Sequence, residues 1–167
     1  MEIFPFQPAT HGHLVPAITK LLHEAYAPLA AAGMNYVASW QDDARTLRRL
    51  EEDESFLFFF EDQVVGTVSL YEGMKKRSSS DYYRQPGVFL FGQFAIHPRF
   101  QGRGWGRLAM EFLEKRARER GGTELALDTA ETAHALIAMY EGLGYRIVSS
   151  TQWPDVVYRS LILSKKL

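Results

Sequence analysis

The chain has 167 residues, of which 46% are hydrophobic and 23% are charged, a composition typical of one globular domain. Its 19 basic and 20 acidic residues give a net charge of −1, which argues against a nucleic-acid binder and against attachment to an anionic membrane by charge alone. The absence of cysteine excludes disulfides, thiol nucleophiles, thiolate zinc sites and iron–sulfur clusters.

The N-terminal segment predicts a short strand followed by a helix. Residues 1–6 are mostly apolar and lack the basic start and long apolar run of a signal peptide, so we expect an edge strand there. Apolar residues recur at spacings of three and four over residues 14–29, which predicts an amphipathic helix. We expect Thr10 to cap this helix, and Pro28 and Gly33 to end it.

A second helix and a hairpin are predicted next. The helix spans residues 40–51, with Ser39 as its N-cap and Trp40 on its apolar side. Residues 56–60 are continuously apolar and residues 64–71 are rich in β-branched side chains. Because only three polar residues separate these segments, we expect them to pair as antiparallel strands.

The second half alternates strands and helices after a long polar stretch. That stretch, residues 72–86, is either a functional loop or a solvated mobile one, and the sequence leaves both open. A strand–helix–strand crossover follows, which implies a parallel pair of strands. We therefore predict an α/β fold with a mixed sheet covered by helices. The predicted strands are 88–96, 124–129, 145–149 and 156–163, and the predicted helices are 105–120 and 132–143.

A glycine-rich loop after the central strand is the most informative segment. Gly102, Gly104 and Gly106 let the backbone approach a ligand closely, and the loop opens into a helix whose free N–H groups favour an anion. Three arginines surround it, so we expect a phosphate or pyrophosphate there. A P-loop would need a lysine, and a dinucleotide-binding loop would need a third glycine at Arg107. Both of these alternatives are weak.

The motif Gln101-x-x-Gly104-x-Gly106 follows an apolar strand and Ile96-His97-Pro98, and it resembles the GNAT superfamily of acyl-CoA N-acyltransferases. The resemblance is clearest over residues 56–145. It implies a mixed, mostly antiparallel sheet of six to seven strands with about four helices. It also implies acetyl-CoA as co-substrate and no metal. The cofactor-binding residues that it implies are Phe94, Ala95 and Ile96 for the pantetheine arm, and Gln101, Gly102, Arg103, Gly104, Trp105, Gly106 and Arg107 for the pyrophosphate.

The resemblance also singles out a tyrosine. Tyr140 shares a helical stripe with Leu136, Met139 and Leu143, and this spacing alone favours a core residue. However, the sequence from Tyr140 to Tyr145 is similar to a family signature whose tyrosine faces the thioester sulfur. The resemblance therefore implies that Tyr140 is catalytic and protonates the departing thiolate of coenzyme A.

Two positions depart from the family pattern. Many members carry a glutamate on the central strand that deprotonates the amine, and the matching position here is Gly92, next to Gln93. An asparagine seven residues before the tyrosine is replaced by Ala133. The general base is therefore open. Its candidates are Glu72, Asp81, His97, Asp128 and His134.

The acceptor site is expected among the first two helices and the loop before the central strand, where the family builds it. Aromatic side chains there would suit a small amine, although each is equally well explained as a core residue. These aromatic residues are Tyr26, Tyr36, Trp40, Tyr71, Tyr82 and Tyr83. His11 and His13 have no third ligand in view, so we interpret them as surface residues and not as a metal site.

These observations predict a single acetyltransferase domain over residues 1–167. We expect direct transfer of an acetyl group from acetyl-CoA to the primary amine of a small molecule in a ternary complex, because no cysteine can carry the acetyl group. The alternatives are a protein or peptide acceptor and a non-catalytic acyl-CoA sensor. No stretch approaches the roughly 18 apolar residues that span a bilayer. We expect a cytoplasmic protein without nucleic-acid or membrane partners, and whether it forms a homodimer is open.

Overall fold

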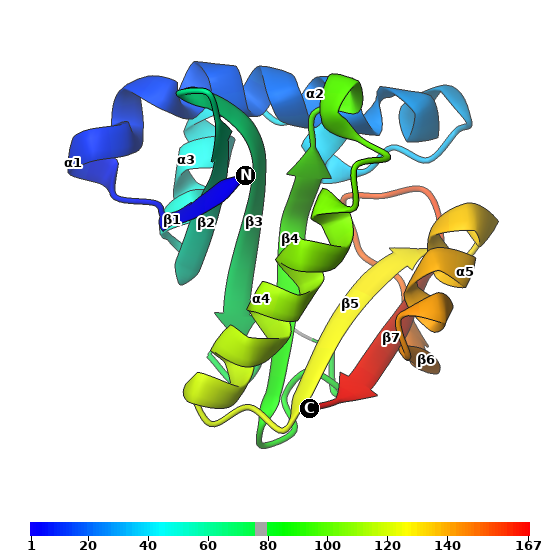
Figure 1. Cartoon of the computed structure of the whole chain (residues 1–167). Coiled ribbons are helices and arrows are strands. Elements are labelled where there is room, and N and C mark those ends of the chain that lie inside the picture. The colour runs from blue at the N-terminus through cyan, green and yellow to red at the C-terminus, as the bar shows by residue number, and fades with distance from the viewer. Residues whose placement is uncertain (76–79) are drawn as a thin grey trace.

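The computed structural model of the chain describes residues 1–75 and 80–167, and it contains one mixed sheet (Figure 1). The strands lie in the order β1-β2-β3-β4-β5-β7-β6. Among the described residues β4 and β5 run parallel, and the other neighbouring strands are antiparallel. The strands are β1 (Glu2–Pro5), β2 (Glu54–Phe60), β3 (Gln63–Glu72), β4 (Val88–Ile96), β5 (Glu124–Ala130), β6 (Arg146–Thr151) and β7 (Ser160–Lys166). The predicted mixed, mostly antiparallel sheet is thus confirmed.

Helices cover both faces of this sheet. The longer helices are α2 (Val15–Ala31), α3 (Asp43–Glu51), α4 (Trp105–Glu119) and α5 (His134–Gly142), and α1 (Pro8–His11) is a single turn. Short 3-10 turns lie at Gly12–Leu14, Val37–Ser39 and Pro98–Phe100. Figure 1 shows α4 and α5 in front of the sheet and α3 behind it. The fold therefore has three layers, with one sheet between two layers of helices.

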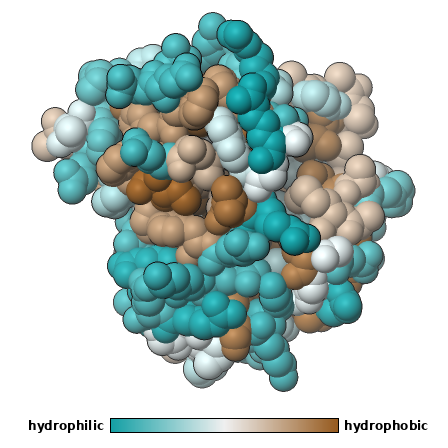
Figure 2. All heavy atoms as spheres, in the orientation of Figure 1, coloured by the Kyte–Doolittle hydropathy of each residue, from teal (hydrophilic) through white to brown (hydrophobic). Residues whose placement is uncertain are grey.

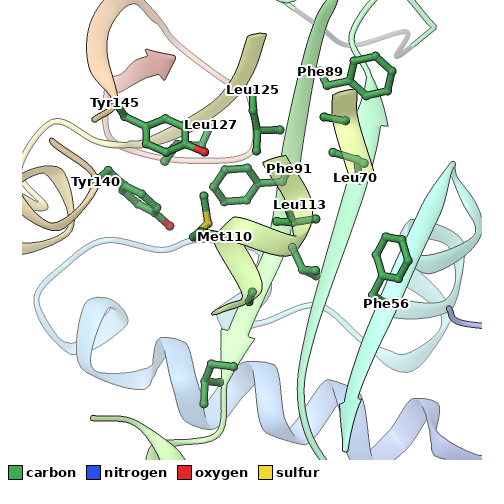
Figure 3. Close-up of a cluster of buried hydrophobic side chains, with 14 of the residues drawn as sticks. Phe56, Leu70, Phe89, Phe91, Met110, Leu113, Leu125, Leu127, Tyr140 and Tyr145 are labelled. Atoms are coloured by element: carbon green, nitrogen blue, oxygen red, sulfur yellow. The ribbon is translucent and has the colours of Figure 1, made fainter. Parts of the chain in front are cut away.

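The alternation of strand residues builds a core on each face. Phe56 and Phe58 of β2 point into a large cluster with Met110 and Leu113 of α4, whereas Leu57 points into a second cluster with α2. Tyr140 lies at one end of the large cluster, facing Phe91 and Met110 (Figure 3). On the same face of the molecule, hydrophobic residues gather over β1 to β3 beside α4, while hydrophilic residues cover much of the rest (Figure 2).

Two predicted caps in the first half are wrong. Thr10 does not cap α2, because it lies in the single-turn α1 and a 3-10 turn separates α1 from α2. The N-cap of α2 is Leu14, whose side chain makes no capping hydrogen bond. The N-cap of α3 is Asp42, whose Oδ1 accepts a hydrogen bond from the N–H of Arg45 at 2.7 Å. A carboxylate at this position also suits the positive end of the helix dipole.

Four further predictions in the helices and strands need correction. Pro28 lies inside α2, which continues to Ala31. Trp40 and Met139 are 46% and 44% exposed, so neither lies on a buried helix stripe. The predicted strand over 156–163 begins only at Ser160. Residues 76–79 of the predicted loop lie outside the described residues.

A bulge in β4 and a gap beside it shape the centre of the sheet. Gln93 and Phe94 together oppose one residue of β3, and Gln93 has a φ of 49°, so β4 has a bulge directly after Gly92. The pairing of β4 with β5 ends at Leu90 opposite Ala126, although both strands continue. Figure 1 shows the two strands diverging beyond this point. The second half of β4 therefore turns one edge of its backbone toward an opening in the sheet.

Candidate active site

A groove of about 370 Å³ runs along the second half of β4. It lies between α2, the glycine-rich loop and α5. Its lining includes seven of the ten residues implied as cofactor-binding, which are Phe94, Ala95, Ile96, Gln101, Gly102, Trp105 and Gly106. The remaining three, Arg103, Gly104 and Arg107, lie at the start of α4 but do not line it.

The backbone of the glycine-rich loop is shaped for close approach. Gly102 and Gly104 have φ values of 74° and 77°, in the left-handed region that favours glycine. Gly104 is the N-cap of α4 and offers no side-chain cap, so the first N–H groups of the helix have no capping oxygen from it. Apart from the adjoining backbone, no described residue comes within 4 Å of the position that a Cβ atom would take at Gly102, Gly104 or Gly106. The loop therefore presents free N–H groups to open space at the positive end of a helix.

Tyr140 projects into this groove from α5. The residue is 7% exposed and its ring contacts Phe91 and Tyr145, at centroid distances of 6.1 and 5.9 Å. Burial raises the pKa of its hydroxyl far above the ordinary value of a tyrosine, and the nearby hydroxyls of Tyr26 and Tyr36 raise it further. No described residue accepts a hydrogen bond from this hydroxyl. It is thus a protonated donor that faces the groove without a partner in the described part of the chain.

A second, larger pocket of about 630 Å³ lies beyond the groove. Its walls come from α3, the first half of β4, the end of β5 and residues 153–158. Tyr26 lines both cavities, and its hydroxyl donates a hydrogen bond to the carbonyl of Phe94 at 3.1 Å. Burial raises the pKa of Tyr26 as well, although the nearby Arg49 guanidinium opposes this shift. The two cavities therefore meet at one tyrosine beside the bulge of β4.

The predicted aromatic wall is partly correct. Tyr26, Tyr36 and Tyr83 line the larger pocket, whereas Trp40, Tyr71 and Tyr82 do not. The sequence interpretation missed Trp153 and Tyr158, which also line it. The reason is local: the sequence predicts a strand over residues 156–159, whereas they form an irregular segment that folds over the pocket.

Three arginines of α3 also line the larger pocket and were not predicted there. Arg45, Arg48 and Arg49 follow one another along one side of the helix. Arg45 pairs with Asp155 across the pocket at 2.7 Å. Arg49 donates from Nη1 to the side-chain oxygen of Gln41 at 2.5 Å. The helical spacing of these residues was visible in the sequence, but an exposed basic face predicts the same pattern.

One of the five candidate bases lines the larger pocket. Asp128 lies there, and it accepts hydrogen bonds from the Tyr83 hydroxyl at 3.0 Å and from Trp153 Nε1 at 2.9 Å. The other four lie elsewhere. Glu72 pairs with Lys75, Asp81 with Arg84 and His97 with Glu24, while His134 is exposed at the start of α5.

Gln93 also lines the larger pocket, but its amide is uncharged and is engaged in hydrogen bonds with neighbouring side chains. It is 2% exposed, accepts a hydrogen bond from Gln41 Nε2 at 2.8 Å and donates one to Ser69 Oγ at 3.2 Å. Gly92, which the resemblance matches to the family's glutamate, borders the larger pocket and carries no carboxylate.

Comparison with known proteins agrees with this geometry. A family model described as "Acetyltransferase (GNAT) family" matches residues 16–145, which is most of the chain. The chain belongs to the GNAT acetyltransferase family. It is therefore an acyl-CoA-dependent acetyltransferase, and the resemblance found in the sequence is confirmed.

Individual relatives of this GNAT domain are distant. It is 30% identical over 108 residues to a protein named acetyltransferase from Yersinia pestis (strain Pestoides F), covering 64% of this chain and 69% of that one. An acetyltransferase from Thermus thermophilus matches with a TM-score of 0.71 at 22% identity, over 99% of this chain and 96% of that one. A GNAT acetyltransferase from Elizabethkingia anophelis, solved with acetyl-CoA bound, matches with a TM-score of 0.68 at 15% identity, over 99% and 97% of the two chains.

None of the described helices is both long enough and apolar enough to cross a membrane. No group of three or more histidine, aspartate or glutamate side chains gathers as a metal site within residues 1–75 and 80–167. The ring of His11 instead lies near Phe6 and Phe59, and its Nδ1 accepts a hydrogen bond from the N–H of Gln7 at 3.0 Å.

Proposed function

We propose that this GNAT domain transfers the acetyl group of acetyl-CoA to the primary amine of a small molecule, within a ternary complex and with residues 1–167 acting as one domain. The observation that carries the proposal is the meeting of two cavities at Tyr26. A pocket of about 630 Å³ falls within the range of roughly 300–1,000 Å³ that is usual for small-molecule sites. Residues 153–158 and α3 wall this pocket, whereas a protein acceptor would need a wide open groove.

The residues along the groove suit acetyl-CoA. The free N–H groups at the start of α4 suit a pyrophosphate, and Arg103 and Arg107 add positive charge beside them. The exposed edge of β4 around Phe94 to Ile96 suits the amide groups of the pantetheine arm, since β5 has diverged from it. Acetyl-CoA would supply an acetyl group that is activated as a thioester.

Two groups of the chain would act on the thioester. A backbone N–H of β4 around the bulge would donate a hydrogen bond to the carbonyl oxygen as negative charge develops there. The Tyr140 hydroxyl would donate its proton to the sulfur as the carbon–sulfur bond breaks. Its raised pKa keeps this hydroxyl protonated across the physiological range. The amine nitrogen loses one proton and the sulfur gains one, so the transfer is balanced when the amine enters uncharged.

Asp128 is the side chain that we propose as the proton acceptor for the amine. It is the one candidate of the five that lines the larger pocket, at the end of β5. The hydrogen bonds from Tyr83 and Trp153 hold its carboxylate in place. A carboxylate fixed in this way can also attract the ammonium form of an acceptor before the proton leaves.

A thiol-release assay with acetyl-CoA tests the proposed function. The purified chain would be offered a panel of small primary amines and, separately, peptides with free N-termini or lysines. We expect release of coenzyme A with small amines and formation of the acetylated amine by mass spectrometry. Turnover of peptides alone would instead support the protein acceptor. Binding of acetyl-CoA without turnover of any amine would support the sensor and overturn the proposal.

A further inference from the structure

We infer that the acceptor of this enzyme carries a carboxylate next to its amine, as an amino acid does, and that Arg49 binds the carboxylate. This inference rests on the proposed function and names its substrate class. The starting observation is the positive charge of Arg49, which lies in the larger pocket next to the position that the resemblance matches to the family's glutamate. Gly92 occupies that position, and Arg49 Nη2 lies 3.7 Å from the point where a Cβ atom of residue 92 would be. A guanidinium nitrogen therefore lies beside the position to which the resemblance assigns a carboxylate.

The guanidinium of Arg49 is held in place from one side. Nη1 donates to the side-chain oxygen of Gln41, which is fully buried. The amide nitrogen of Gln41 in turn donates to Thr46 and Gln93, each at 2.8 Å. A chain of buried hydrogen bonds thus fixes Arg49 against β4 and limits the rotamers that it would lose on binding.

The other side of the same guanidinium faces the pocket. Arg49 lines the pocket and is half-buried, and its Nη2 donates no hydrogen bond to any residue that the structure describes. A partly desolvated guanidinium with donors to spare is the group that best binds a carboxylate, through charge-assisted hydrogen bonds. An ammonium group placed beside it would instead be repelled.

The remaining charges of the pocket define where the amine lies. Arg45 of α3 pairs with Asp155, and Arg48 and Glu52 of the lining are exposed. Arg49 is the half-buried cation of α3 that lies beside β4. Asp128 provides a carboxylate on the β5 side of the same pocket. A molecule with a carboxylate at Arg49 and an amine toward Asp128 complements both charges at once. Such a molecule is a zwitterion, and the aromatic walls at Tyr36, Tyr83 and Trp153 suit its side chain.

Matched acceptors separate this inference from the proposed function. The thiol-release assay would use the twenty common amino acids, their primary amides and the corresponding decarboxylated amines. We expect the best amino acid to exceed its own amide and amine in kcat/KM by about 10- to 100-fold, as the loss of charge-assisted hydrogen bonds implies. Turnover of amides or amines at equal or higher kcat/KM would overturn the inference and leave the proposed function standing. Turnover of no amine at all would overturn both.

Variants then assign the preference to Arg49. We expect Arg49→Gln to lower kcat/KM for the best amino acid by about 10- to 100-fold, mainly through KM, and to change kcat/KM for its amide by less than about 3-fold. Arg118→Gln, which removes an exposed arginine from α4 on the opposite face of the sheet, controls for the loss of one positive charge. An equal loss for the amino acid and the amide in Arg49→Gln would overturn the assignment.

A second substitution reaches the same question without removing the arginine. Gly92 has no positive φ, and a Cβ atom there meets Tyr71 and Arg49 only at ordinary contact distances of 3.6 and 3.7 Å. Gly92→Glu would therefore place a carboxylate onto Arg49 and compete with the acceptor. We expect KM for the amino acid to rise about 10-fold or more in Gly92→Glu relative to Gly92→Ala, which controls for the added Cβ atom. Equal KM values in these two variants would contradict a carboxylate at Arg49.

Discussion

The hydroxyl of Tyr140 can be removed without disturbing the packing of its ring. The ring lies in the core beside Phe91 and Tyr145, while no described residue accepts a hydrogen bond from the hydroxyl. We expect Tyr140→Phe to lower kcat by roughly 10²–10⁴-fold, because loss of a general acid has that effect. The dissociation constant for acetyl-CoA and the thermal midpoint should stay near the wild-type values. Calorimetry would check the dissociation constant, and a thermal melt would check the midpoint. Wild-type kcat in Tyr140→Phe would show that Tyr140 serves only in packing and is not the general acid.

Asp128 has a structural and a chemical role that a pH profile can separate. It accepts hydrogen bonds from Tyr83 and Trp153, so Asp128→Asn turns one acceptor into a donor and we expect it to cost about 1–3 kcal/mol of stability. If it is the base, the same variant should also lose the acidic limb of kcat/KM against pH. Asp81→Asn, which changes an exposed carboxylate outside the pocket, is the matched control. If Asp128→Asn lowers kcat/KM at every pH but keeps the acidic limb, Asp128 has a structural role and is not the base.

Within the element that begins at the glycine-rich loop, Gly106 offers a cleaner probe of cofactor binding than Gly104. Gly104 has a φ of 77°, so any side chain there strains the backbone whether or not a ligand binds. Gly106 lies inside the first turn of α4, lines the groove and has open space beside it. We expect Gly106→Glu to abolish measurable binding of coenzyme A, because its carboxylate meets the pyrophosphate.

Gly106→Ala controls for the helix itself. It should stabilise α4 by about 0.5–1 kcal/mol through its higher helix propensity, which a thermal melt would detect. Wild-type affinity for coenzyme A in Gly106→Glu would contradict the placement of the pyrophosphate at this helix end.

The elements show what the sequence could predict and what it could not. Strand β4 matches its predicted bounds of 88–96, because its apolar run is a local signal. The cap of α3 was missed since Ser39 and Asp42 are both good capping residues, and only the 3-10 turn at Val37–Ser39 decides between them. Capping propensity identifies both residues as candidates, but the backbone conformation before the helix determines which of them is the N-cap.

The larger pocket was harder to predict for a different reason. Its walls come from segments that are far apart in the sequence, such as α3 and residues 153–158. Periodicity places Arg49 on a polar helix face, but it does not say that Asp155 lies opposite that face or that Gly92 leaves room beside it. The glycine-rich loop, by contrast, carries its whole signal within a few residues. A site formed by consecutive residues can therefore be predicted from one sequence, whereas a pocket formed by segments that are distant in the sequence cannot.

At the scale of the whole molecule, the tyrosines make stability depend on alkaline pH. Burial is the largest cause that raises the pKa of seven of the eight tyrosines, at positions 26, 36, 82, 83, 140, 145 and 158. Above the unfolded value of about 10, the unfolded chain loses these protons while the folded chain keeps them. The contribution of these tyrosines to the free energy of unfolding is therefore fully present below about pH 10. It falls above that pH, by up to about 1.4 kcal/mol per pH unit for each deeply buried tyrosine.

Urea unfolding between about pH 8 and pH 12 would measure this decline, with tyrosinate absorbance as a second probe. Tyr140→Phe should make the decline shallower by about one proton. A free energy of unfolding that stays level beyond pH 10 would show that these hydroxyls ionise equally easily in both states.

The two cavities are lined by different stretches of β4 and share only Tyr26 among the described residues. If acetyl-CoA binds in the groove and the acceptor in the larger pocket, we expect each substrate to enter and leave without waiting for the other. This arrangement predicts a random order of addition, in which initial-velocity lines intersect whichever substrate is varied. Coenzyme A would compete with acetyl-CoA for the groove but not with the acceptor, and the acetylated product would compete only with the acceptor. An enzyme with two such cavities would bind and release each substrate independently of the other.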